Sequence, residues 1–204
     1  MATYDGVEAL YGKIQATGRP VEAIAINAGV GVGGEFAHET DLKDELNLIN
    51  LNVVSTVHLA KRVVKDMVDR GKGRILFTSS IAALMPGPFE AVYAASKAFI
   101  HSFAEGIRNE LKDTGVTVTS LMPGPTDTNF FHRAGMDDTK AGAKQKDDPA
   151  DVAKQGFEAL MAGKDAVIAG SLMTKLQGNV SKVLPNTIAS EQHRKLAEPG
   201  SANK

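Results

Sequence analysis

Tyr93 and Lys97 stand four residues apart in the segment YAASK, so on a helix their side chains share one face. A nearby ammonium favours the phenolate and lowers the pKa of a tyrosine from its usual value of about 10. Such a tyrosine donates or accepts a proton at a carbonyl or alcohol oxygen. The same spacing also arises by chance in a chain of this composition, and the alternative is a pair on a solvent-exposed helix face.

Two serines and an asparagine carry polar side chains that could contribute to the same site. Ser79 and Ser80, in FTSSIAA, follow an apolar run with the pattern of a strand, and open α/β sheets bind ligands at the carboxyl ends of strands. Either hydroxyl could bond the same substrate oxygen, or satisfy the turn that follows. Asn52 lies within an apolar helical pattern, where an unpaired amide is costly to bury. It would hold a water or a backbone group near the site, or be a satisfied structural amide.

Gly124 lies between two prolines, Pro123 and Pro125, directly after another apolar run. This arrangement predicts a rigid turn that could form the wall of a site for a ring-shaped ligand, or serve only as a turn. The five histidines lie far apart and none stands near a carboxylate at ligand spacing, so we expect no metal site.

Gly29, Gly31 and Gly34 match the spacing G-x-G-x-x-G of a dinucleotide-binding turn. In such a turn a helix begins at the third glycine and holds the pyrophosphate at its amino end. Here the next segment, GEFAHETDLKDE, carries five carboxylates, and helical periodicity resumes only near Leu46. We therefore predict that this loop is not a phosphate site.

The elements that must position these residues alternate between helical and strand patterns, which is typical of a parallel sheet covered on both faces. We expect strands at 21–27, 73–80, 116–123 and 165–170. Helices are expected at 5–17, 44–70 and 89–112, and in a segment capped by Asp148 with Pro149 at its first position and Gly163 at its end. The tail from Pro185 is polar, and we expect it to be loosely packed.

The chain of 204 residues is long enough for one α/β domain, and we expect residues 1–204 to form it. A net charge of −1 with dispersed basic residues argues against nucleic acid or an anionic membrane as a partner. The absence of cysteine excludes disulfides and thiolate catalysis, and no signal peptide or membrane-spanning run is evident. We expect a cytoplasmic protein.

Together, these motifs resemble the short-chain dehydrogenase/reductase family in order and spacing. The matching residues are Asn27-Ala28-Gly29, Asn52, Ser80, Tyr93, Lys97 and Pro123-Gly124 with Thr128. The resemblance implies an NAD(P)-dependent enzyme that reduces carbonyls or oxidises secondary alcohols. It implies Tyr93 as acid or base, Ser80 as the group that orients the substrate oxygen, Lys97 as a ribose ligand, and Asn52 in a water relay. By the same resemblance, Asn27, Ala28 and Gly29 line the cofactor, and the backbone from Pro123 and Gly124 through Thr126 to Thr128 contacts the nicotinamide.

The family's phosphate-binding sequence, T-G-x-x-x-G-x-G, does not occur in the chain. The resemblance therefore implies a truncated, doubly wound Rossmann-like sheet in which the first three family strands are absent and the catalytic half remains. Strand 21–27 would then be an exposed apolar edge. We expect a partner chain, as in a homo-oligomer, or a rearranged segment of the chain itself to cover it.

Two other functions remain open at this level. One is proton-transfer chemistry without nicotinamide, as in the related halohydrin dehalogenases, although these have arginine where this chain has Lys97. The other is a catalytically silent chain that acts through protein association. Residues 126–148 correspond to the family's mobile substrate lid, where Phe130 and Phe131 would form an apolar wall or pack on the sheet. His132 and Arg133 would meet a polar substrate end or lie in solvent.

Overall fold

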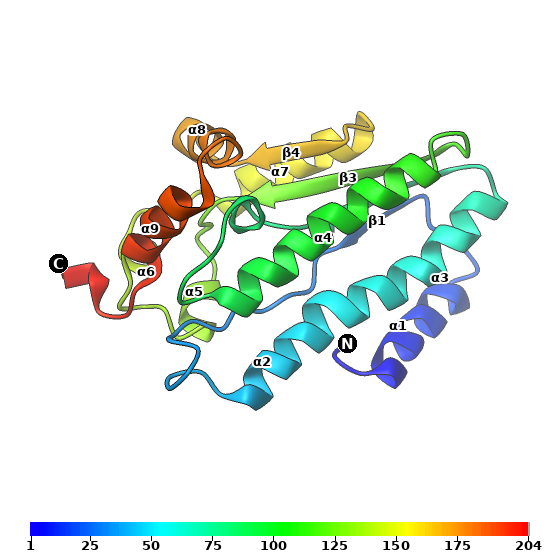
Figure 1. Ribbon diagram of the computed structural model, residues 1–204. Coiled ribbons are helices and arrows are strands. Elements are labelled where there is room, and N and C mark those ends of the chain that lie inside the picture. The colour runs from blue at the N-terminus through cyan, green and yellow to red at the C-terminus, as the bar shows by residue number, and fades with distance from the viewer. Residues whose placement is uncertain (204) are drawn as a thin grey trace.

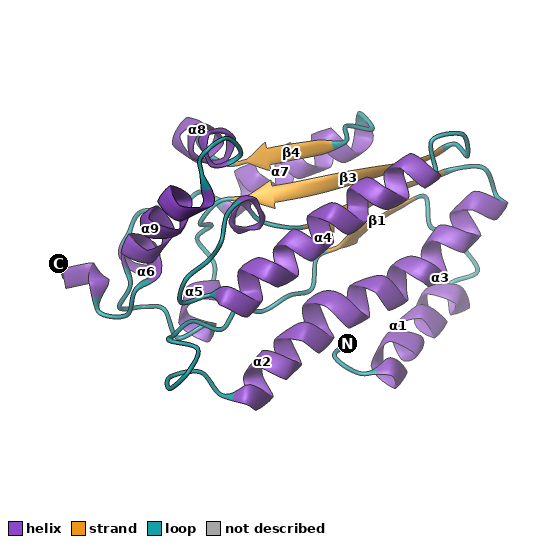
Figure 2. Cartoon of the chain, in the orientation of Figure 1, coloured by secondary structure: helices purple, strands orange, loops and turns teal. Residues whose placement is uncertain are grey.

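The computed structural model describes residues 1–203 and is built around one parallel sheet (Figures 1 and 2). The sheet has four strands in the order β1-β2-β3-β4. These are β1 (Ala23–Ile26), β2 (Gly73–Thr78), β3 (Val116–Pro123) and β4 (Ala166–Ala169). Helices lie on both faces (Figure 1), so the predicted α/β fold is confirmed.

One face of the sheet is covered by three helices, α1 (Tyr4–Ala16), α3 (Ser55–Asp69) and α4 (Ala91–Glu110). Alternate side chains of β2 point to opposite faces, as the pleat requires. Ile75 and Phe77 are fully buried under these helices. Leu76 packs on the other face with the side chains of α7 (Pro149–Met161). This two-sided burial fixes which side chains of the strand face each layer of helices.

The helix predicted at 44–70 is a continuous helical run with an irregularity in its middle. It consists of α2 (Leu42–Ile49), a π-helical turn (Asn50–Val54) and α3. Asp41 caps its amino end by accepting a hydrogen bond from the backbone N–H of Lys43 at 2.7 Å. A π-turn accommodates one extra residue in a helix and is frequent at functional sites.

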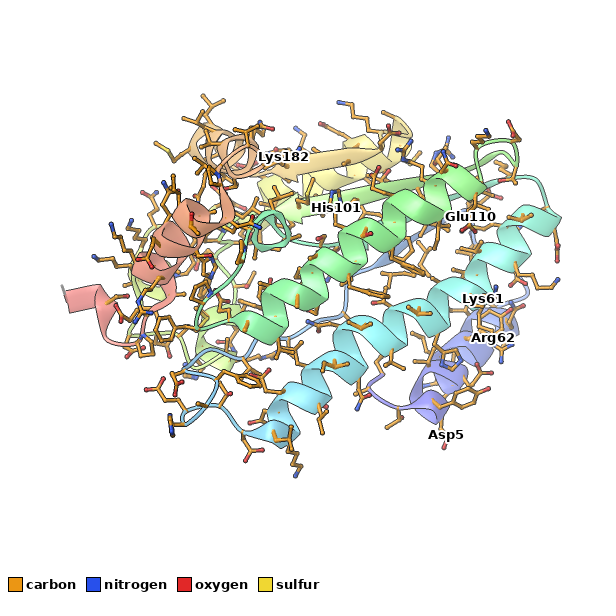
Figure 3. The ribbon with its side chains drawn as sticks, viewed as in Figure 1. Asp5, Lys61, Arg62, His101, Glu110 and Lys182 are labelled. Carbon is orange, nitrogen blue, oxygen red and sulfur yellow. The ribbon has the colours of Figure 1, made fainter. Side chains whose placement is uncertain are left out.

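Polar contacts attach α1 to α3. Arg62 of α3 lies beside α1 (Figure 3), and its guanidinium donates to the Glu8 carboxylate at 2.9 Å. The Tyr11 hydroxyl donates to Asp66 at 2.7 Å, while Val7 is buried in the core between the two helices and the sheet. The first helix is therefore held by both apolar and polar contacts.

Short helices gather at the carboxyl ends of the strands, at the left of Figure 1. They are α5 (Phe130–Arg133), α6 (Lys140–Ala143), α8 (Leu172–Ser181) and α9 (Asn186–Ala197), with 3-10 turns at Ile81–Leu84 and Ser201–Asn203. The expectation of a loosely packed tail from Pro185 was wrong. Residues 186–197 form α9, which buries Ala189, His193 and Ala197. These three lie four residues apart, so they share one narrow helix face in a segment that is polar elsewhere.

Strand β1 pairs with β2 in the register Ala23 to Arg74 through Ile26 to Phe77. Within residues 1–203, it has no second strand neighbour. Its inward side chains join the core, whereas Ala23 and Ala25 remain exposed. Covering of this edge by another chain stays a prediction. Among the described helices, none is both long and apolar enough to cross a membrane.

Candidate active site

A cavity of about 580 Å³ opens at the carboxyl ends of the strands and brings most of the predicted site residues together. The predicted residues that line it are Asn27, Gly29, Ser80, Tyr93, Lys97, Pro123, Gly124, Thr126 and Thr128. Two others, Ala28 and Asn52, belong to the adjoining loop and helix and do not line it. The placement agrees with the general location of ligand sites in open α/β sheets.

The two serines after β2 have different roles. Ser79 is buried, and its hydroxyl donates to the backbone carbonyl of Lys97 at 2.7 Å, which fastens α4 to the sheet. Ser80 lines the cavity, and its hydroxyl lies close enough to Tyr93 to lower the tyrosine pKa. Its oxygen also accepts from the Ala82 N–H at 3.1 Å and so caps the following 3-10 turn. Ser80 is therefore the serine placed to act on a ligand.

Tyr93 is almost fully buried near the start of α4. Burial raises the pKa of its hydroxyl, the Glu90 carboxylate raises it further, and the nearby Ser80 hydroxyl has the opposite effect. This direction is opposite to the lowering expected from Lys97. The Lys97 Nζ atom lies 5.7 Å from the centre of the Tyr93 ring and donates its hydrogen bond elsewhere. Tyr93 is thus a protonated phenol at neutral pH.

Lys97 extends from α4 to the end of β2, where Nζ donates to the Thr78 carbonyl at 2.9 Å. Burial lowers the pKa of Lys97 to about 8. A Cβ atom at Gly29 would lie 3.3 Å from Nζ, so only a glycine lets the loop approach the ammonium without crowding. Among the described residues, Thr78 is the one acceptor bonded to Nζ. Two of its three N–H groups are therefore available to a ligand in the cavity.

Asn52 is fully buried in the π-turn, and its amide supports the loop after β1. Its Oδ1 accepts from the Val30 N–H at 2.9 Å, and its Nδ2 donates to the Val30 carbonyl at 2.9 Å. Nδ2 also donates to the Ser96 hydroxyl at 3.0 Å. The amide therefore holds a backbone group beside the site, which is one of the roles expected from the sequence. It fixes the loop that places Gly29 beside Lys97.

As predicted, no helix begins at the third glycine of the glycine-rich loop. Helix α2 begins only at Leu42, and the glycines instead permit close packing of the segment after β3. A Cβ atom at Gly31 would lie 2.6 Å from the Phe130 ring, and the Gly33 N–H donates to the Ala134 carbonyl at 2.8 Å. The loop therefore forms one wall of the cavity.

The turn after β3 is fixed by its own polar contacts. Gly124 packs against Thr174 so closely that a side chain at this position would collide with it. The Thr126 hydroxyl donates to the Gly124 carbonyl at 2.9 Å, and the Thr128 hydroxyl accepts from the Phe130 N–H at 3.3 Å. The turn and the start of α5 thus form a wall of the cavity, and their own hydrogen bonds hold this wall in place.

The segment expected to be a lid contributes aromatic side chains to the cavity. Phe130 and Phe131 both line it, and the Phe130 ring lies 5.2 Å from the Tyr93 ring. His132 is exposed and bonds Asp137 at 2.7 Å, so it lies outside the cavity, whereas Arg133 is among the lining residues. The apolar-wall interpretation of both phenylalanines therefore fits their placement.

A family model described as short chain dehydrogenase matches residues 1–139. The chain belongs to the short-chain dehydrogenase family. It is 34% identical over 140 residues to a short-chain type dehydrogenase/reductase of Sinorhizobium fredii, covering 69% of this chain and 54% of that protein. It is 32% identical over 138 residues to an NADP-dependent 3-hydroxy acid dehydrogenase of Salmonella typhi, covering 67% and 56%. The chain thus spans little more than half the length of these relatives.

Solved structures of other family members share the fold. A short-chain dehydrogenase from Sphingobium yanoikuyae in complex with NADPH superposes with a TM-score of 0.74 at 23% identity, covering 82% of this chain and 64% of that one. A 7β-hydroxysteroid dehydrogenase gives a TM-score of 0.76 at 21% identity, covering 94% and 73%. These likenesses establish the fold, and the family to which the chain belongs is one of oxidoreductases.

Sequence reasoning missed two residues of the cavity, Glu90 and His193. Both are buried and line the cavity, and His193 Nε2 lies 3.0 Å from Glu90 Oε2. Glu90 precedes Tyr93 by three residues, a spacing that could have indicated a shared helix face. His193 is 103 residues farther along, in a segment with no local signal of its position.

Proposed function

We propose that the chain contains the catalytic site of an NAD(P)-dependent reductase of carbonyl compounds, with Ser80, Tyr93 and Lys97 as its catalytic residues. One observation carries this proposal. Tyr93, Ser80 and the buried Lys97 border a single cavity at the strand ends, and the Ser80 hydroxyl lies close enough to Tyr93 to lower its pKa. Oxidation of a secondary alcohol is the reverse of the same reaction.

The protonation state of Tyr93 favours the reductive direction. Because burial and Glu90 raise its pKa, Tyr93 keeps its proton and donates it to a carbonyl oxygen. The Ser80 hydroxyl orients that oxygen and stabilises the negative charge that develops on it. A bound nicotinamide supplies the hydride. The Phe130 ring lies beside Tyr93 and gives the cavity an apolar wall at this point.

The residues present fit the nicotinamide end of such a cofactor. The ammonium of Lys97 has N–H groups available beside Gly29, where the absence of a side chain leaves room for ribose hydroxyls. Asn27, Ala28 and Gly29 are exposed and can contact the middle of the molecule. The chain has no T-G-x-x-x-G-x-G turn for the pyrophosphate. We therefore expect weak binding of the cofactor to this chain by itself.

The test is a titration of the purified chain with NADPH and NADH, followed by fluorescence. We expect saturable binding that Lys97→Ala weakens and that the matched variant of an exposed lysine, Lys154→Ala, leaves unchanged. With a panel of aldehydes and ketones, Tyr93→Phe should abolish reduction while binding persists. No binding up to millimolar cofactor would refute the proposal. Turnover without nicotinamide would instead favour the proton-transfer alternative.

A further inference from the structure

The cavity has a polar end formed by two buried side chains that lie far apart in the sequence. Glu90 stands at the amino end of α4, and His193 belongs to α9. His193 Nε2 lies 3.0 Å from Glu90 Oε2, and both residues are less than 10% exposed. The Glu90 carboxylate is also near enough to Tyr93 to raise its pKa. The pair therefore borders the same space as the proposed reaction centre.

The backbone before Glu90 is held in an unusual conformation. Phe89 has a φ of 63°, a left-handed value that is uncommon outside glycine and strains the backbone. Its carbonyl accepts from the Gly34 N–H at 2.9 Å, and the Arg194 guanidinium lies 5.0 Å above its ring. These contacts hold Phe89 from both sides, and the turn they fix places Glu90 against His193.

In the Glu90–His193 pair, each side chain uses one of its two polar atoms to bond the other. Within the described residues, Glu90 Oε1 and His193 Nδ1 make no hydrogen bond, and neither atom is sealed off by its neighbours. Because Nε2 faces the Glu90 carboxylate, Nε2 carries a proton and donates it in this hydrogen bond. The other ring nitrogen, Nδ1, is then an acceptor when the ring is neutral and a donor when it is charged. A hydroxyl group suits Glu90 Oε1, because its single O–H donates to the carboxylate while His193 Nε2 holds the other carboxylate oxygen.

Much of the remaining cavity lining is apolar and includes Ile81, Ala82, Met85, Phe130, Phe131 and Leu196. The polar side chains of Asn129 and Gln177 also border the cavity. Arg133 also borders the cavity, but its side chain is largely exposed to solvent. Buried polar atoms in such surroundings discriminate strongly between ligands with and without a matching group, since an unmatched ligand leaves them unpaired.

We propose that Glu90 and His193 form a subsite for a second hydroxyl group of the substrate, so that the preferred substrate is an apolar ketone or aldehyde that also carries a hydroxyl. The carbonyl lies at Tyr93 and Ser80, and the hydroxyl donates to Glu90 Oε1, while His193 holds the carboxylate through its bond to Oε2. This inference rests on the proposed function for the position of the carbonyl. The hydroxyl subsite itself is tested by binding, without turnover.

The experiment measures binding of methyl ketones of four to eight carbons, with and without a terminal hydroxyl, by ligand-observed NMR titration. At one chain length the hydroxyl should tighten binding by at least about tenfold, the effect of one hydrogen bond to a charged acceptor. Glu90→Ala and His193→Phe should each remove most of this ratio, and Glu90→Gln, which keeps an acceptor, should retain part of it. Glu158→Ala, on the exposed surface of α7, is the matched control.

The ratio of the two affinities within one variant cancels any general loosening of the cavity. A hydroxyl preference below twofold at every chain length in the unmodified chain would overturn the inference. So would a preference that survives both Glu90→Ala and His193→Phe, tighter binding of the matched keto acids than of the hydroxy ketones, or no binding at all. Hydroxyl-dependent binding without reduction in the presence of NADPH would support the subsite and contradict the proposed function.

Discussion

Replacing Lys97 with methionine removes a charge that the fold buries, and this change should alter how stability depends on pH. Burial lowers the pKa of Lys97 from its ordinary value of 10.5 to about 8. Between these values the unfolded chain holds a proton that the folded chain has lost. Stability of the unmodified chain should therefore rise with pH in this window, and Lys97→Met should abolish the rise.

The size of the effect follows from the two pKa values. Each pH unit between them contributes about 1.4 kcal/mol, so the full contribution is about 3 kcal/mol. About 2 kcal/mol of it falls between pH 8 and 10. The raised pKa of Tyr93 has the opposite sign, because the folded state then holds the extra proton, but it acts only above about pH 10. Measurements that stop at pH 10 thus isolate the lysine.

The assay is urea unfolding followed by circular dichroism at pH 7, 8, 9 and 10. The free energy of unfolding of the unmodified chain, minus that of Lys97→Met, should increase by about 2 kcal/mol from pH 8 to 10. Lys154→Met, at an exposed position, should run parallel to the unmodified chain. Parallel curves for Lys97→Met as well would show that the ammonium is not desolvated and would refute the reasoning.

Three further outcomes are expected. Asn52→Ala removes the amide that holds the loop after β1 and should lower the free energy of unfolding by about 2–4 kcal/mol in urea, with a loss below about 1 kcal/mol contradicting its role. Gly31→Ala forces a methyl against the Phe130 ring and should cost about 1–3 kcal/mol, whereas Gly12→Ala, which meets open space in α1, should not destabilise the chain. Ala25→Lys places a charge on an exposed position of the edge strand. It should reduce self-association in light scattering without changing the circular dichroism spectrum, and a chain that is monomeric before the change would disprove the expected pairing.

Local patterns were sufficient to predict the sheet and the main helices, because each strand or helix carries its own periodicity. The run at 73–80 predicts β2, and the strand ends then bring Ser80 and the turn after β3 to one edge. The spacing of Tyr93 and Lys97 likewise places both on one face of α4. These features depend on neighbours in the sequence.

The features that could not be predicted depend on contacts between distant segments. The direction of the Tyr93 pKa follows from burial, which the four-residue spacing does not reveal. The partner of Glu90 comes from α9, a helix whose polar composition hides a single row of small buried residues. The helical pattern around Asn52 also conceals the π-turn, since apolar spacing is preserved on either side of it.

That π-turn makes the site sensitive to the length of the chain as well as to its composition. A regular helix advances about 100° per residue, and the π-turn absorbs one extra residue while α2 and α3 stay in line. Deleting one residue within 50–54 would let the helix become regular and would change which residues of this turn face the loop after β1. Asn52 would then leave Val30, although no side chain had been substituted. Libraries of single deletions should find this turn intolerant in a region where most conservative substitutions are accepted.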